Sequence, residues 1–548
     1  MNILSKKVLL LIFIMLIAGV LRFWQLGKVP VSPDWDEVAL GYNAYSILKT
    51  GRDEYGTKLP LSLRSYDDYK PPLYVYLTIP SVAVFGLTVW AVRLPSAIMG
   101  LFAVLGVYFL TQELILLDRR EKSDHRESFI PLFAAFLLAI SPWHIQFSRI
   151  AFEANTGVTL NIWGAYALFR GRKSAWWLAL SAFLFGLSLY AYHSERVFAP
   201  LIFLIIVALT WKEFISRSRS VIVAFVIGLL TVLPLIIVSL NPTALMRLKG
   251  TSSLSDQTGL LARSTQLLED DLEAGNKLGV LFDNRRLVWA KTIFDGYISH
   301  YSFQWLFLNG DNPRHHAPDM GLLYLWELPF LLWGMVAVWK RGGKLSILLF
   351  SWFLIAPVAA SVTTELPHAI RTLVFLPVFQ LFTAFGLISF LLWVKSGSRF
   401  RRIWIIVLVG VAIFNLAYYL DMYYVHMDHE FSEYWQYGYK QAVEYARVHR
   451  NQYTKIVVST KLEQPHMFFL FYTKYDPVAY LKGGGTASGG FAEVKNHFDI
   501  YDFRPIDWGR EVKDGKTLYI GTPKEIPAGT LDTIKYLDGT DAIHITDH

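Results

Sequence analysis

The sequence predicts an α-helical protein that crosses a membrane many times and ends in a small α/β domain outside the membrane. The chain has 548 residues, of which 53% are apolar, and its mean hydropathy is +0.35. Apolar runs of about 18 residues or more recur as far as Leu420, separated by short basic segments, which is typical of a polytopic membrane protein. After Leu420 the composition changes to that of a soluble domain. We therefore expect a membrane domain over residues 1–420 and an extracytoplasmic domain over residues 421–548.

Composition excludes several classes of function. The chain has no cysteine, which rules out thiolate catalysis, cysteine-based zinc sites and disulfides. Its 18 Trp and 29 Tyr suit membrane interfaces, where both residues are enriched. The formal net charge of +8 lies mostly in the connections between apolar runs, so membrane orientation explains it better than binding to nucleic acid. We expect membrane lipids as partners and no nucleic acid.

The topology follows from where the basic segments fall. The first apolar run, about residues 8–26, lacks a small-residue cleavage site, so we expect it to remain as a span. Lys6 and Lys7 precede it, which places the N-terminus in the cytoplasm. The next run, residues 73–85, is short, and charge decides its placement. If it only lies at the interface, the basic segments all become cytoplasmic; these are residues 119–126, 170–173, 212–219, 340–344 and 395–402.

This choice gives about eleven spans in a plasma-membrane protein whose C-terminus lies outside. After the first span, they are expected at about residues 92–117, 129–147, 154–169, 175–192, 197–211, 220–239, 320–339, 345–361, 370–393 and 403–420. The outward-facing connections are then residues 27–77, 148–153, 193–196, 241–319 and 363–368. The first of these is expected to hold helices beside the membrane, and residues 241–319 form a second large outer loop.

The region after residue 420 has the pattern of a small α/β domain. Its expected elements are helices at 431–449 and 464–473, strands at 455–459 and 517–521, and a hairpin of 534–537 with 542–545. Asp538-Gly539 supplies the turn of that hairpin. The glycine-rich stretch 483–490 lacks the G-x-x-x-x-G-K-[ST] pattern, so we interpret it as a loop and expect no nucleotide site.

The loop over residues 27–77 is unusually acidic for a segment beside a membrane, and we interpret it as part of an active site. Asp34 can cap a helix that begins there, and Glu37 stands three residues later, as in a capping box. One apolar face of this helix comprises Val38, Tyr42, Tyr45 and Leu48. The helix is too short to span, so we expect it to lie along the membrane surface.

Four clusters of ionisable residues fall on the outer side. They are Asp36-Glu37, Asp67-Asp68-Tyr69-Lys70-Pro71-Pro72, the segment from Arg149 to Glu153, and a group comprising His193, Arg314-His315-His316 and His368 to Arg371. Carboxylates beside several cations suit a reaction on a lipid phosphate. A carboxylate can deprotonate an acceptor hydroxyl while Lys and Arg stabilise the departing phosphate oxygens.

Three of these features together resemble a known family. An Asp-Glu pair follows the first span, Lys70-Pro71-Pro72-Leu73 ends the same loop, and Glu153 begins the fourth span. In this order they resemble the C-type glycosyltransferase (GT-C) superfamily. More narrowly, they resemble the glycosyltransferase family 39-like group of protein O-mannosyltransferases and bacterial lipid A aminoarabinose transferases. The resemblance covers the membrane region, most specifically residues 33–100 and 141–157. It implies a GT-C fold and transfer of a sugar from a polyprenyl-phosphate carrier at the outer face, generally with inversion.

The resemblance also implies roles for individual residues. Asp36 would be the catalytic acidic residue, with Glu37 beside it, Glu153 the second functional acid, and Lys70 the contact to the donor phosphate. The outer position of Arg149 and Arg371 suggests further phosphate contacts, and residues suited to substrate binding are Asp68, Tyr69, His193 and His315. No cofactor is certain. A divalent metal ion remains an option, with Asp36, Glu153 and His315 as candidate ligands; His315-His316 stands near Asp311 and Asp319.

Simpler roles compete with each of these. Asp36 could only complement a helix N-terminus, Lys70 could anchor to headgroups, and Arg149 could pair with Glu153 one helical turn away. A transporter or flippase of lipid-linked sugars is the rival function, but it should show internal repeats and ionisable residues at midplane, which the sequence lacks. A third option is an envelope-assembly protein without activity. The sugar (a mannose-like hexose or a pentose) and the acceptor (lipid, glycan or protein) stay open.

Overall fold

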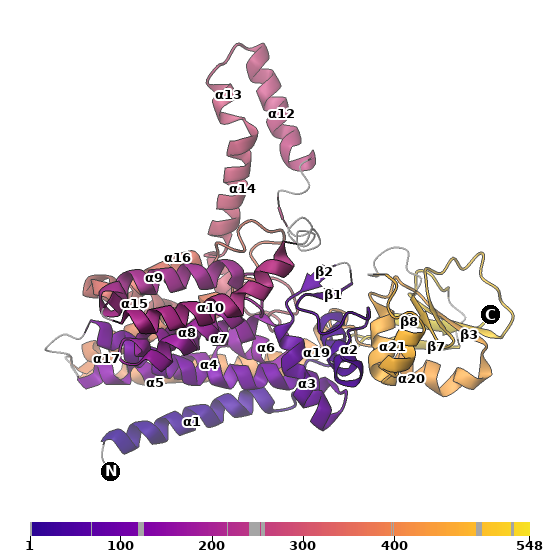
Figure 1. The fold of residues 1–548 in the computed structure, drawn as a ribbon, viewed down its shortest axis with the longest axis horizontal. Coiled ribbons are helices and arrows are strands. Elements are labelled where there is room, and N and C mark those ends of the chain that lie inside the picture. The colour runs from indigo at the N-terminus through magenta and orange to yellow at the C-terminus, as the bar shows by residue number, and fades with distance from the viewer. Residues whose placement is uncertain are drawn as a thin grey trace.

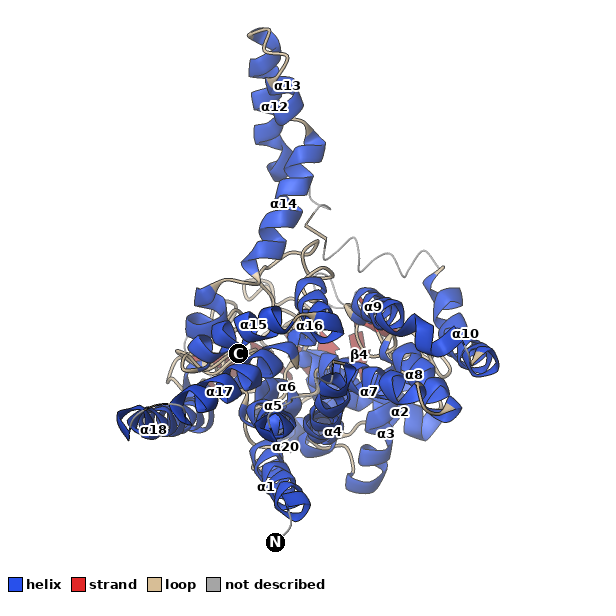
Figure 2. Ribbon diagram, turned by 90° about the vertical axis from the view of Figure 1, so that its left-hand side faces the viewer, coloured by secondary structure: helices blue, strands red, loops and turns tan. Residues whose placement is uncertain are grey.

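A computed structural model describes the chain except for residues 1–2, 67, 119–124, 216, 241–251, 254–257, 396, 398, 489–495 and 528–530. It consists of a long helical bundle with a smaller α/β part at one end (Figure 1). The bundle comprises α1 (Ile3–Phe23), α4 (Val89–Leu117), α5 (Ile130–Ile140), α6 (Pro142–Arg149), α7 (Ala154–Gly171), α8 (Ala175–Ser188), α9 (Glu195–Ile215), α10 (Ser218–Ser239), α15 (Glu327–Arg341), α16 (Gly343–Ile355), α17 (Val378–Lys395) and α18 (Arg399–Asp421). Figure 2 shows α10 and α18 at opposite edges of this bundle.

The helices of the bundle identify a membrane protein. Among the described residues, five helices are long and apolar enough to cross a membrane, and a sixth counts if α5 and α6 form one bent span. Each of the predicted spans contains a helix. The number of about eleven spans remains a prediction, because several of these helices are too short to cross alone.

The predicted continuous span at residues 129–147 is wrong. The helix breaks at Ser141-Pro142, and α5 and α6 meet at an angle of 57°. Proline has no N–H, so the carbonyl of Leu138 loses its helical donor. Arg22 replaces that donor: its guanidinium bonds the carbonyls of Leu138 (3.2 Å) and Ala139 (2.9 Å). Arg22 is fully buried, so these bonds complete the backbone at the break inside the bundle.

The loop over residues 27–77, predicted to be the first outer loop, holds α2 (Trp35–Thr50), the hairpin of β1 (Leu63–Ser65) with β2 (Asp68–Lys70), and the start of α3 (Leu73–Phe85). With 13 residues, α3 is about 20 Å long, shorter than the roughly 30 Å hydrocarbon core, so its expected place at the interface is consistent with its length. The predicted surface position of α2 is wrong. Its residues from Glu37 to Ala44 are all buried, because α2 lies between the bundle and the α/β part.

Gly41 shows how closely α2 is enclosed. A Cβ atom at this position would lie 2.6 Å from a methyl group of Val92 in α4 and 2.7 Å from the ring of Phe471 in α21 (Pro465–Thr473). Only glycine leaves room for both neighbours. The helix therefore packs against the membrane bundle on one side and the α/β part on the other.

Part of the second outer loop forms a projecting helical arm. It consists of α12 (Thr258–Glu273), α13 (Gly279–Phe282) and α14 (Arg285–Ser299), and it extends away from the bundle (Figures 1 and 2). Short irregular helical turns complete the chain; these are η1 (His125–Phe129), η2 (Trp305–Asn309), η3 (Leu373–Phe375), η4 (Met422–His426) and η5 (Arg450–Gln452).

The C-terminal part is built on a six-stranded mixed sheet of order β4-β5-β3-β6-β8-β7. Its strands are β3 (Lys455–Val458), β4 (Asn496–Phe498), β5 (Tyr501–Phe503), β6 (Thr517–Gly521), β7 (Asp532–Lys535) and β8 (Asp541–Thr546), and its helices are α19 (Met427–Glu430), α20 (Tyr439–His449), α21 and α22 (Pro477–Lys482). The predicted strands at 455–459 and 517–521 and the C-terminal hairpin are confirmed. The helix predicted to start at residue 431 begins only at Tyr439, and β4 and β5 were not predicted. Residues 489 and 490 of the predicted glycine-rich loop lie outside the described chain.

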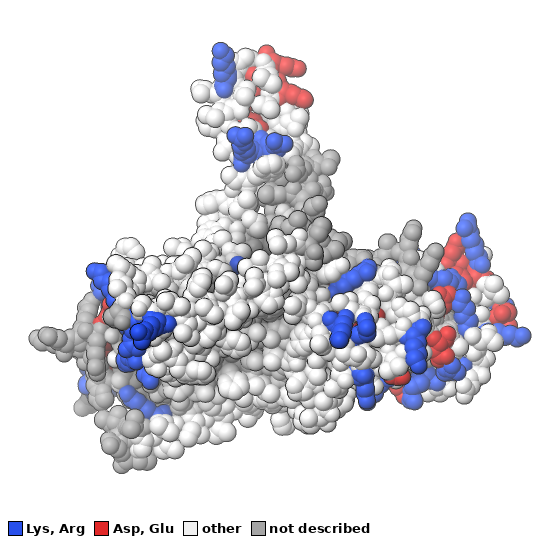
Figure 3. All heavy atoms as spheres, in the orientation of Figure 1, with Lys and Arg blue, Asp and Glu red and all other residues white. Residues whose placement is uncertain are grey.

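Ion pairs link the basic segments that connect helices at the end of the bundle far from the C-terminal sheet. Glu113 pairs with Arg170 and Arg172, and Glu213 pairs with Arg172 and Lys344. Lys and Arg cluster visibly at this end, left in Figure 3. The ammonium of Lys7 lies 5.2 Å from the ring centroid of Phe129, so the N-terminus lies at the same end. The structure thus groups the segments that charge had assigned to one side of the membrane.

Single-cysteine labelling can test the orientation, because the natural chain has no cysteine. Lys173 is exposed in the basic connection between α7 and α8, and Lys524 is exposed after β6 of the C-terminal sheet. In intact cells, a membrane-impermeant maleimide should label Lys524→Cys and should label Lys173→Cys only after lysis. Labelling of Lys173→Cys from outside would reverse the proposed orientation.

Candidate active site

A buried ion pair joins α2 to the bundle. Both carboxylate oxygens of Glu37 accept from Arg93, at 2.9 and 2.8 Å, and Oε1 also accepts the N–H of Ala151 at 2.9 Å. The remaining Arg93 donors bond the carbonyls of Leu26, Pro30 and Ser32. Glu37 is 1% exposed and Arg93 0%. The predicted capping box is therefore only half right: Asp34 accepts the Glu37 N–H at 2.8 Å, while the Glu37 side chain is committed to Arg93.

A second ion pair fixes the start of α2 from the other side. Asp34 is fully buried, and its Oδ2 accepts from Arg314 Nη1 at 3.0 Å. The same guanidinium lies 4.5 Å from the ring centroid of Trp35, a cation–π contact. Burial raises the pKa of Asp34 to about 7, and the neighbouring Asp36 and Glu37 add to the rise while Arg314 opposes it. Asp34 therefore caps the helix, and its two carboxylate oxygens accept from the Glu37 N–H and from Arg314.

The pair that reaches solvent is Asp36 with Lys70. The ammonium of Lys70, at the end of β2, donates to Asp36 Oδ1 and lies 5.5 Å from the ring centroid of Tyr66. The Asp36 side chain is 30% exposed and that of Lys70 9%. Burial alone would lower the pKa of Lys70, but Asp36 and then Glu153 outweigh it and raise the pKa. Lys70 thus stays charged beside an accessible carboxylate.

Glu153 adds a second carboxylate to this site. It occupies the N-cap position of α7 and is 7% exposed, and its charge acts on Lys70. Three predicted residues, Asp36, Lys70 and Glu153, are therefore brought together although they are far apart in sequence. An accessible base beside a cation can deprotonate a hydroxyl and bind a phosphate.

Arg149 does not belong to this site. It is fully buried, and its three nitrogens bond the Leu21 carbonyl (3.0 Å), the Val29 carbonyl (3.0 Å) and the Tyr423 hydroxyl (3.1 Å). We correct its predicted role: it ties the end of α1 to the chain after α18 and is not placed to bind a phosphate. None of these three bonds involves Glu153, which was the partner expected for Arg149 in the simpler, structural role.

The other predicted substrate residues support the loop that carries Lys70. His193 Nε2 lies 3.1 Å from the Tyr69 carbonyl oxygen, and the Tyr69 N–H donates to Asp68 Oδ1 at 2.7 Å.

Arg371, predicted to contact the donor phosphate, donates to Thr363 Oγ1 and to the Thr364 carbonyl, both in the connection just before it. Asp67 lies outside the described residues.

His315 takes part in a different cluster from the one expected. Its Nδ1 lies 2.9 Å from Asp311 Oδ2, and among the described residues Asp311, His315 and His368 form the one group with metal-ligating atoms within 4.8 Å of one another. The metal set proposed from sequence, with Asp36 and Glu153, is therefore not assembled: Asp36 faces Lys70 instead.

Sequence reasoning missed Arg93 and Glu54, and it did not identify the partner of Arg314. A signal existed for Arg93, because an arginine inside an apolar span is rarely without a specific partner. Arg314 was noted among the outer cations, but its partner lies 280 residues away. Glu54 is buried and accepts from Asn43 Nδ2 (2.9 Å) and Thr486 Oγ1 (2.7 Å); that connection to the C-terminal part has no local sequence signature.

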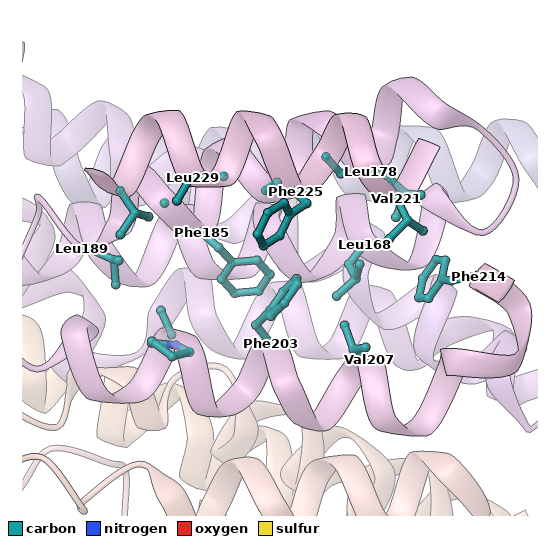
Figure 4. A pocket seen from close by; sticks show the side chains of 17 residues that line it. Leu168, Leu178, Phe185, Leu189, Phe203, Val207, Phe214, Val221, Phe225 and Leu229 are labelled. Atoms are coloured by element: carbon teal, nitrogen blue, oxygen red, sulfur yellow. The ribbon is translucent and has the colours of Figure 1, made fainter. Parts of the chain in front are cut away.

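One cavity lies within the helical bundle, and another lies between the bundle and the C-terminal part. One has a volume of about 550 Å³ among α7, α8, α9 and α10, and Figure 4 shows its lining side chains, which include Phe185, Leu189, Phe203 and Phe225. It is lined by apolar residues alone and suits a hydrocarbon chain. The other, about 690 Å³, is polar and lies between the start of α2 and the C-terminal part; its walls include Trp35, Arg314, Glu433, Lys461 and Glu463.

Comparisons with known proteins agree on one fold. Residues 69–238 match the family model for dolichyl-phosphate-mannose-protein mannosyltransferases, while a search of curated proteins finds no match. The structure is similar to ArnT from Cupriavidus metallidurans, with a TM-score of 0.52 and 12% identity over 99% of this chain and 98% of that one. The same protein bound to undecaprenyl phosphate gives a TM-score of 0.51, with 12% identity and the same shares of both chains covered.

A similar fold occurs in an archaeal protein. The oligosaccharyltransferase AglB from Archaeoglobus fulgidus, solved with an inhibitory peptide and a dolichol-phosphate, gives a TM-score of 0.50 and 14% identity, over 86% of this chain and 64% of that one. These likenesses and the family match agree with the resemblance seen in the sequence, and the expected fold is confirmed.

Replacing Glu37 with Gln should destabilise the protein by about 3–5 kcal/mol, because it leaves the Arg93 charge buried without its partner. The measurement is the unfolding midpoint of the purified protein in detergent. The double variant Glu37→Gln/Arg93→Met removes the isolated charge and should recover part of the loss. A single variant as stable as the wild type would show that the pair is dispensable.

Glu54 should make stability depend on pH. Burial raises its pKa from 4.5 to about 7, against the hydrogen bonds from Thr486 and Asn43. Because the folded state favours the protonated form, the stabilisation is complete below the unfolded pKa and is lost as the pH rises through about 7. Between about pH 5 and about pH 8, the wild type should therefore lose more thermal stability than Glu54→Gln. Glu444→Gln, at an exposed position of α20, is the control and should follow the wild type; equal pH profiles for all three proteins would contradict the assignment.

Proposed function

Because residues 69–238 match the family model for dolichyl-phosphate-mannose-protein mannosyltransferases and the fold is similar to that of ArnT, we propose that the chain transfers a sugar from a polyprenyl-phosphate donor to an acceptor hydroxyl. The sugar is a mannose-like hexose or a pentose, and the reaction takes place at the outer face of the plasma membrane with inversion. The observation that carries this proposal is the pair of Asp36 and Lys70, an accessible carboxylate against a charged ammonium beside the membrane bundle.

Each residue of the pair has a separate task. Asp36 accepts the proton of the acceptor hydroxyl while the hydroxyl oxygen attacks the anomeric carbon of the sugar. The bond from that carbon to the phosphate oxygen breaks, and the lipid phosphate leaves with the electron pair. Lys70 stabilises the phosphate oxygens through charge-assisted hydrogen bonds. Asp34 and Glu37 are buried and engaged with Arg314 and Arg93, so Asp36 is the better base.

A lipid donor fits the surroundings of Lys70. The apolar cavity in Figure 4 is lined by Leu189, and the carbonyl of the next residue, Tyr190, accepts the N–H of Leu73 at 3.1 Å. Leu73 follows Lys70 by three residues, so one end of the cavity adjoins the loop that carries the ammonium. The complexes of ArnT with undecaprenyl phosphate and of AglB with a dolichol-phosphate support a ligand of the same class.

The polar cavity is the proposed route for the acceptor. It begins at Trp35, next to Asp36, and continues between Lys461 and Glu463 of the C-terminal part. Its aromatic and charged walls suit a hydroxyl-rich or charged group. This assignment is compatible with lipid, glycan and protein acceptors. In each case we expect the accepting hydroxyl to belong to a polar group.

The direct test is transfer in proteoliposomes with a panel of polyprenyl-phosphate sugars, scored by which sugar is consumed. Asp36→Asn should fold normally and lose about 10²–10⁴-fold in turnover, as expected for removal of a general base. Asp532→Asn, on the exposed edge strand β7, is the control and should turn over like the wild type. Undiminished turnover by a folded Asp36→Asn protein would leave Asp36 as a helix-terminus residue only.

A further inference from the structure

A cluster of two histidines and an aspartate lies next to the site but takes no part in the proposed reaction. Asp311 and His315 belong to the segment that follows the helical arm, and His368 comes from the connection before η3. Candidate ligand atoms of the three side chains lie within 4.8 Å of one another. Two chain segments that are far apart in sequence therefore converge on one point.

The cluster contains polar atoms that protein contacts leave unsatisfied. Asp311 Oδ2 accepts the Ala369 N–H at 2.7 Å and faces His315. Asp311 Oδ1 and His368 Nδ1 are buried and have no hydrogen-bond partner in the described part of the chain. His315 is only 4% exposed. Such atoms are costly to bury unless a ligand completes their bonding.

The donor set matches a particular class of ligand. Two imidazoles and one carboxylate are typical of zinc and of similar divalent transition metals. Zinc binds these atoms at about 2.0–2.2 Å, so its ligands lie roughly 3.3–3.6 Å apart, and the cluster needs only a modest contraction to reach that geometry. Three protein ligands leave a position for water or another oxygen.

We propose that Asp311, His315 and His368 form a binding site for a divalent transition metal ion, with zinc as the best match. Two neighbouring cations are already engaged: Arg314 pairs with Asp34, and Arg371 bonds Thr363 and Thr364. The Asp311 carboxylate provides the negative charge that favours the ion.

A metal ion bound here would hold neighbouring residues of the proposed active site in place and would not itself take part in the reaction. His315 directly follows Arg314, whose guanidinium holds Asp34 at the start of α2. The His315 ring also packs against Phe152, with centroids 6.2 Å apart, and Phe152 precedes Glu153. A metal ion that joins residues 311–315 to His368 therefore fixes the segment that braces Asp34 and lies beside Glu153.

Metal analysis of the full-length protein tests this proposal without any assay of transfer. The untagged protein in detergent is stripped with chelator, equilibrated separately with zinc, manganese or magnesium, desalted, and measured by elemental mass spectrometry. We expect about one zinc ion per chain for the wild type, and loss of this ion in Asp311→Asn and in His368→Gln. The matched control is His316→Gln: His316 is adjacent, but its Nδ1 bonds the Ala317 carbonyl, so this variant should keep the zinc.

A spectroscopic readout completes the test. X-ray absorption of the zinc-loaded wild type should show two imidazole ligands, and zinc should raise the unfolding midpoint of the wild type and of His316→Gln. Absence of bound zinc and manganese in the wild type would overturn the proposal, as would unchanged zinc content in both ligand variants. Either result would leave the proposed transfer reaction intact, because no step of it passes through the metal.

Discussion

The buried pair of Glu37 and Arg93 is the interaction on which the end of the bundle next to the C-terminal part depends. Taking two charges out of water is unfavourable unless hydrogen bonds complete both groups. Here all five N–H donors of Arg93 have acceptors, two on Glu37 and three on backbone carbonyls after α1. Glu37 in turn holds the backbone of Ala151. The pair thus places α2, and with it Asp36, relative to α4 and to Glu153.

Much of the fold could be predicted from sequence because it rests on local patterns. Apolar runs located the helices of the bundle, and turn chemistry located the C-terminal hairpin. The positions of Asp36 and Lys70 in one loop were also predictable, and the structure brings them into contact. The partners of the buried arginines could not be predicted, because Arg22, Arg93 and Arg149 bond groups that are distant in sequence.

The same limit explains the error on α2. Its apolar positions suggested one face against a membrane, but residues on every side of it are buried. Its second neighbour, α21, lies more than 400 residues further along the chain and cannot be inferred from local periodicity. The residues of α2 and α3 share one hydrophobic cluster with α20, α21 and the sheet. The change in composition after Leu420 marks a soluble segment, while the packing joins that segment to the first outer loop.

The missing side chain at Gly41 has a consequence for how substrates enter. With Val92 on one side of α2 and Phe471 on the other, the C-terminal part cannot swing away as a lid without exposing a continuous apolar surface to water, at about 25 cal/mol for each Å². A hinged opening in every turnover is therefore unfavourable. In the proposed reaction, the acceptor therefore enters by diffusion through the cavity that begins at Trp35, next to Asp36, and its capture needs no domain closure.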